Sequence, residues 1–127
     1  MPVVFQKWIK RQDLKDNPDK LYLFGDNYQR YGLGGQAKEM RGEPNALGIV
    51  TKKEPNNNEN SFLKDEHLGS NIRFFMDDMS RAINFLQKGG TVVIPEDGLG
   101  TGLSQLPTKA PKTNEFLSML IKWMETI

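Results

Sequence analysis

Two glycine-rich stretches carry the residue types best suited to binding a phosphorylated ligand. Residues 32–37 have the sequence GLGGQA and residues 98–102 the sequence GLGTG, and an apolar run comes before each of them. Glycines let the backbone approach a ligand closely, and the unpaired N–H groups at the start of a following helix attract an anion. A single glycine most often only makes a turn, but two such loops predict a phosphate site.

Polar side chains stand where three apolar runs of the chain end. These side chains are Asp26, Asn27, Thr51, Lys52 and Asp97. A lysine at the end of a strand is usually solvated, but burial or a nearby cation lowers its pKa and leaves a nucleophilic amine. His67 is the only histidine and the chain has no cysteine, so we expect no metal site and no cofactor.

Strands and helices alternate along the chain. Apolar runs predict strands at 3–8, 21–24, 45–51 and 91–95. Helices are predicted at about 34–42, 70–88 and 113–125. The pattern is typical of an α/β layered fold with a largely parallel sheet, whose ligands bind beyond the carboxyl ends of the strands. The loops 25–36, 51–54 and 96–104 should therefore converge at that edge.

Other segments have simpler predictions. The apolar positions of the helix 70–88 are Ile72, Phe75, Met76, Met79, Ile83 and Leu86, which we expect to face the core. Residues 54–60 predict an exposed loop, because their side chains cannot build a core. Pro107 and Pro111 predict an irregular stretch before the last helix.

Composition limits the class of protein. The length of 127 residues suits one domain, and the net charge of +1 gives no general attraction to nucleic acid. No apolar run approaches the roughly 20 residues of a membrane span, and residues 1–8 do not resemble a signal peptide. We therefore expect a cytoplasmic protein that acts as a monomer.

The order of these features resembles the macrodomains, which are ADP-ribose-binding modules. The features are a strand, a polar loop with Asn27, the sequence GLGGQA, a strand ending in Thr-Lys-Lys, and the sequence PEDGLGTGL. The resemblance runs from about residue 21 to the carboxyl terminus and is strongest to the branch that cleaves ADP-ribose from carboxylate esters. It implies one domain over residues 1–127, with a three-layer α/β/α fold and a mixed, largely parallel sheet.

The resemblance also assigns roles to residues. Asp26, Asn27 and Arg30 would face the distal ribose. The first loop would wrap that ribose and one phosphate through Gly32, Gly34, Gly35, Gln36 and Ala37. The second loop would bind a phosphate through Gly98, Gly100, Thr101, Gly102, Leu103 and Ser104, and Thr51 would complete the set. Lys52 would attack C1 of the distal ribose.

Two features depart from the macrodomain pattern. The ester-cleaving branch carries an aspartate where Ser104 stands, so Asp97 would replace it as the acid–base group. The Gly-Asp-Ile signature that binds adenine is absent after the first strand, which implies that other groups hold the adenine.

The same residues also fit other functions. A reader or sponge of ADP-ribose signals would use the same fold without catalysis, and the serine at position 104 favours it, whereas Lys52 favours an enzyme. The sequence GLGGQA also fits the G-x-G-x-x-A pattern of dinucleotide-binding proteins, although several residues separate it from the preceding strand. No P-loop motif occurs in the chain.

Overall fold

Four strands form one sheet in the computed structural model of the chain, which describes residues 2–127 and, of Gly102, the backbone alone. The strands are β1 (Val3–Gln6), β2 (Lys20–Asn27), β3 (Ala46–Lys52) and β4 (Thr91–Pro95). Their order across the sheet is β1-β4-β2-β3, and each neighbouring pair is parallel. The α/β fold is thus confirmed, and this sheet is parallel throughout rather than mixed.

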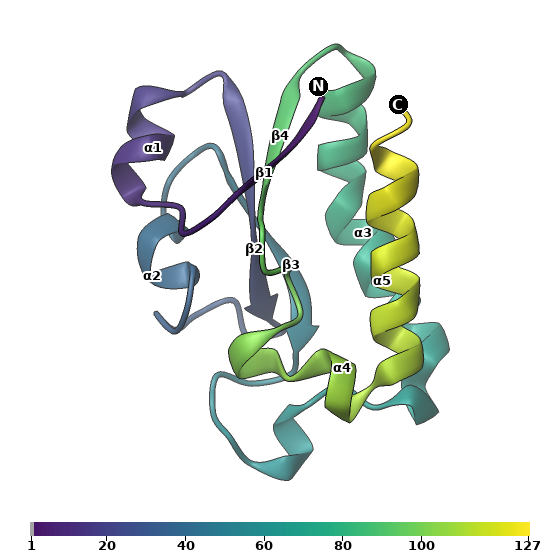
Figure 1. Cartoon of the computed structure of the whole chain (residues 1–127). Coiled ribbons are helices and arrows are strands. Elements are labelled where there is room, and N and C mark those ends of the chain that lie inside the picture. The colour runs from purple at the N-terminus through teal and green to yellow at the C-terminus, as the bar shows by residue number, and fades with distance from the viewer. Residues whose placement is uncertain (1) are drawn as a thin grey trace.

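Helices cover both faces of the sheet (Figure 1). One face carries α1 (Arg11–Asp16) and α2 (Ala37–Met40), and the other carries α3 (Leu68–Gln87) and α5 (Pro111–Met124). The shorter elements are α4 (Leu106–Lys109) and the 3-10 turns η1 (Glu59–Ser61), η2 (Asp65–His67) and η3 (Gly102–Ser104). Among residues 2–127, no helix combines the length and the apolar character that crossing a membrane requires.

Alternating side chains of the strands build two separate cores. Leu21 and Leu23 of β2 point into the larger core, which α3 and α5 cover. Tyr22 and Phe24 of the same strand point into the smaller core beneath α1 and α2. This division follows from the period of two in a β-strand, and it gives the three-layer arrangement that the resemblance implied.

Strand β2 extends three residues beyond its predicted end. The segment 25–27, which we expected to begin the polar loop 25–36, pairs with β3, and a register shift separates Asp26 from Asn27. The pairing buries the carboxylate of Asp26, and an ion pair with Arg41 at 2.5 Å compensates for its charge. A partner distant in sequence therefore allows a charged residue to lie within a strand.

Two predictions about helices need correction. The helix α3 is confirmed, but Met76 is 41% exposed, and the buried positions are Asn71, Phe75, Met79, Ala82 and Leu86. The stretch with Pro107 and Pro111 contains α4 and the start of α5 instead of irregular chain. Both prolines lie in the first turn of a helix, where the missing N–H group has no intrahelical partner to lose.

Candidate functional site

Crevices form at the carboxyl edge of the sheet because the chain leaves neighbouring strands toward opposite faces. After β2 the chain continues to α2 on one face, whereas after β3 and β4 it continues to the helices of the other face. Such reversals are where open parallel sheets bind ligands. Two cavities lie at this edge: cavity 1, beyond β1, β4 and β2, and cavity 2, beyond β2 and β3.

The two cavities adjoin each other. Their volumes are about 230 Å³ for cavity 1 and about 200 Å³ for cavity 2. Gly25, Gly34, Leu103 and Ser104 line both of them. Ligand pockets usually measure roughly 300–1,000 Å³. Each cavity alone is smaller than that range, whereas the two volumes together reach it, so a ligand that occupied both cavities would be elongated.

The first glycine loop lines both cavities. Gly32 and Ala37 line cavity 2, Gly35 lines cavity 1, and Gly34 lines both. Gly32 and Gly35 have φ values of 105° and 57°, a conformation that favours glycine. A Cβ atom at Gly34 would lie 2.6 Å from Cδ1 of Leu103, so the absent side chain keeps the two loops close.

Gln36 lines cavity 1, but its amide group is used within the protein. Its Nε2 donates to the carbonyl oxygen of Ile9, and its Oε1 accepts from the Ile9 N–H, both at 2.8 Å. These two hydrogen bonds fasten the segment after β1 to the start of α2. Both polar atoms of the Gln36 side chain are therefore engaged by Ile9, and the side chain forms part of the wall of cavity 1.

Asp26 and Arg41 form a partly buried ion pair that lines cavity 2. Arg41 donates to both carboxylate oxygens of Asp26, at 2.5 and 3.3 Å, and its Nε donates to the carbonyl oxygen of Gly32 at 2.8 Å. The pair thus holds the first glycine loop against β2. Sequence reasoning missed Arg41, although it lies one helical turn after Ala37, on the same side of α2.

Asn27 and Arg30 play different structural roles. The side chain of Asn27 lines cavity 2, where it donates to the carbonyl oxygen of Tyr31 and accepts from the N–H of Gln29. Arg30 lines neither cavity, because its guanidinium donates to the Gly48 carbonyl and pairs with Asp78 of α3 at 2.6 Å. The structure therefore places Arg30 away from the predicted ligand site.

The side chain of Lys52 is largely buried at the end of β3. The residue is 6% exposed and lines cavity 2. Its Nζ lies 3.4 Å from Oδ1 of Asn57 and 4.8 Å from the centre of the Phe62 ring. Burial lowers the pKa of Lys52, and no carboxylate within residues 2–127 forms an ion pair with it. Lys53 lines neither cavity, so the two neighbouring lysines have different surroundings.

Thr51 connects β3 to the second glycine loop. Its Oγ1 lies 2.7 Å from Oγ of Ser104, and either hydroxyl can donate the hydrogen bond. Thr51 is fully buried and lines neither cavity, whereas Ser104 lines both. The predicted contact of Thr51 with a ligand is therefore indirect, through the position of Ser104.

The second glycine loop divides between the cavities and the core. Gly98 and Thr101 line cavity 1, together with Asp97. Gly100 lines neither cavity. A Cβ atom at this position would lie 2.6 Å from Cδ2 of the buried Leu106, so Gly100 faces the core. Gly100 therefore serves packing. Gly102 belongs to η3, and its surroundings lie outside the described part of the structure.

Asp97 lines cavity 1 alone and Lys52 lines cavity 2 alone. The structure thus does not bring the two predicted catalytic residues into one cavity. Several cavity residues escaped prediction, namely Lys7, Trp8 and Glu96 in cavity 1 and Pro55, Asn56 and Asn57 in cavity 2. Each follows the end of a strand by a few positions, which is the signal that could have identified it.

Comparison with known proteins places the chain in a family. Residues 4–120 match a group described as a family of unknown function (DUF7831). The match covers most of the chain, so the chain belongs to this family. No curated protein and no solved structure matches the chain.

Proposed function

We propose that this member of the DUF7831 family binds ADP-ribose or a nucleotide derived from it. The observation that carries the proposal is the meeting of two cavities along Gly25 and Gly34 at the carboxyl edge of a parallel sheet. A diphosphate needs close approach of backbone N–H groups, which glycines permit. ADP-ribose carries a sugar at each end of its diphosphate. It would therefore place one sugar in each cavity and its diphosphate beside Gly25 and Gly34, where the two cavities meet, a place that we call the junction.

The polar groups around the junction support the same ligand class. Lys7 in cavity 1 and Lys52 in cavity 2 supply a positive charge on either side of the proposed diphosphate position. The amides of Asn56 and Asn57 offer donors and acceptors to ribose hydroxyls in cavity 2. In this arrangement the diphosphate lies at the junction and the distal ribose occupies cavity 2.

Calorimetric titration with ADP-ribose tests the proposal. The parent protein should bind, and Gly34→Ala should bind more weakly because the new methyl group enters the junction. Gly69→Ala is the matched control, since a Cβ at that α3 position meets no atom within 4 Å. A folded parent that releases no binding heat at about 1 mM ligand, the weak end of specific affinity, contradicts the proposal.

Lys52 supports hydrolysis of an ADP-ribosyl ester as a second candidate function. Its desolvated amine loses its proton more readily than an exposed lysine. In the proposed step, Nζ of the neutral amine bonds to C1 of the distal ribose, the C1–O ester bond breaks, the carboxylate leaves with the electron pair, and the nitrogen releases one proton to solvent. Water then adds to C1, the C1–N bond breaks, and the amine regains its proton.

The carboxylates near the cavities favour the non-catalytic alternative. Asp26 is paired with Arg41, and Asp97 lies in the other cavity from Lys52. Release of ADP-ribose from a glutamate-modified protein separates the alternatives. Hydrolysis predicts activity in the parent and in Lys53→Ala, and none in Lys52→Ala. Activity that survives Lys52→Ala excludes this nucleophile, whereas a parent that binds without releasing ADP-ribose acts as a reader.

A further inference from the structure

We propose that Trp8 is the stacking surface for the base of the bound nucleotide. This inference rests on the proposed function and assigns the base to cavity 1. The chain lacks the Gly-Asp-Ile signature that binds adenine, so another group has to hold the base. Trp8 lines that cavity and is 52% exposed, directly before the fully buried Ile9. A large aromatic side chain that stays half exposed at the mouth of a cavity is available to a planar ligand.

The backbone on both sides of Trp8 is fixed. The carbonyl oxygen of Gln6 accepts from the Glu96 N–H at 2.7 Å, which ends the pairing of β1 with β4. Ile9 is held through its N–H and its carbonyl by the amide of Gln36. The indole is therefore presented from an ordered segment, and little conformational freedom is lost when a base stacks on it.

The surroundings of the indole leave it open to a ligand. No aromatic ring or cation within residues 2–127 stacks on Trp8. The side chains of Glu96 and Asp97 form no hydrogen bond with other described residues. Their carboxylates are acceptors for the exocyclic amine of a base that lies against the indole.

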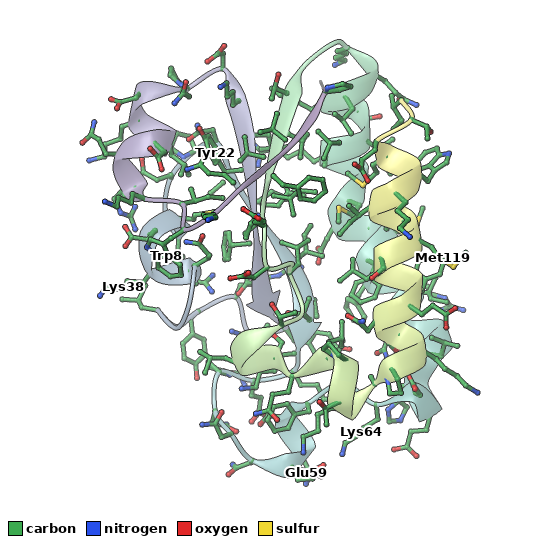
Figure 2. All side chains as sticks on the ribbon, in the orientation of Figure 1. Trp8, Tyr22, Lys38, Glu59, Lys64 and Met119 are labelled. Carbon is green, nitrogen blue, oxygen red and sulfur yellow. The ribbon has the colours of Figure 1, made fainter. Side chains whose placement is uncertain are left out.

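Figure 2 shows Trp8 beside α2, on the opposite side of the sheet from α5. The only other tryptophan, Trp123, belongs to α5 and is 49% exposed, outside both cavities. Trp123 is therefore a matched control for Trp8, with the same side chain and nearly the same exposure but no contact with the proposed ligand.

Calorimetry with two ligands tests the inference. Trp8→Ala should weaken ADP-ribose binding by about 5- to 150-fold, the usual effect of removing one stacked aromatic. Trp8→Phe should retain most of the affinity, and Trp123→Ala should equal the parent. Ribose 5-phosphate lacks a base, so its affinity should be the same for all four proteins. In Trp123→Phe, where Trp8 is the only tryptophan, saturation with ADP-ribose should quench the emission.

The outcomes separate this inference from the proposed function. If Trp8→Ala binds ADP-ribose within twofold of the parent, or if Trp123→Phe shows no quenching at saturation, Trp8 is not the stacking surface, while the proposed function stands. If the folded parent binds no ADP-ribose, the proposed function and this inference both fail. Should Trp8→Ala not fold, Trp8→Phe and the quenching measurement decide the question.

Discussion

Adding one methyl group at Gly25 should disrupt the junction between the two cavities. Gly25 lies near the carboxyl end of β2, where the second glycine loop passes over it. A Cβ atom at this position would lie 2.2 Å from the carbonyl oxygen of Leu99 and 3.1 Å from Oγ1 of Thr51. The first contact is with backbone, which cannot rotate away as a side chain can, so the loop itself must move.

The expected cost of Gly25→Ala is about 3 kcal/mol of unfolding free energy, the upper end of the range for overpacking. Gly34→Ala provides the comparison, because its Cβ would meet the end of the flexible Leu103 side chain, which is 54% exposed. That side chain can rotate into solvent, so Gly34→Ala should stay within about 0.5 kcal/mol of the parent.

Urea unfolding of the parent and both variants measures this difference. Only Gly25→Ala should show a clear drop in the urea midpoint, and the slope should be unchanged in both variants. If Gly25→Ala is as stable as Gly34→Ala, the second glycine loop does not lie against Gly25 of β2, and the place where the two cavities meet is described incorrectly.

Two further predictions concern the charged groups of cavity 2. Arg41→Ala leaves the Asp26 carboxylate, which is 3% exposed, with the Asn27 N–H at 2.8 Å and Arg30 as its nearest cation at 3.7 Å, so the unfolding free energy should fall by about 2–3 kcal/mol. Restored stability in Arg41→Ala with Asp26→Asn would support this cause, and a loss below about 1 kcal/mol would contradict it. Burial lowers the pKa of Lys52 in the folded protein, whereas in the unfolded chain the pKa keeps its ordinary value of 10.5. At a pH between these two pKa values, the unfolded chain therefore binds more protons than the folded protein. The parent should therefore gain stability relative to Lys52→Met as pH rises through this window, and a flat or falling difference in denaturation midpoint would refute it.

The sheet and most helices were predictable because their signals are local. The apolar run at 91–95 and the helical spacing of Phe75, Met79 and Leu86 each belong to one segment, and both elements formed as expected. The position of Lys52 at a strand end also followed from a local pattern. Strand β2 was predicted too short because the partner that neutralises Asp26 is Arg41, fifteen positions along the chain.

The roles of individual glycines were harder to predict. Gly34 and Gly100 belong to similar loops, yet Gly34 faces the cavities and Gly100 faces the core residue Leu106. Which side of a loop faces a cavity depends on tertiary packing, which the sequence of the loop does not encode alone. Gln36 is similar, because its use by the Ile9 backbone depends on the segment after β1 packing against the start of α2.

The most direct test of ADP-ribose binding in the joined cavities is an amide ¹H–¹⁵N spectrum recorded during titration with ADP-ribose. The proposal predicts saturable shifts for Gly34, Gly35 and Gly98, whose backbones line the cavities, and unchanged signals for Gly69 and Gly89, which lie at the two ends of α3. Saturable shifts confined to other parts of the chain, or no shifts at all in a folded sample, would contradict the assignment of the nucleotide to these glycine loops.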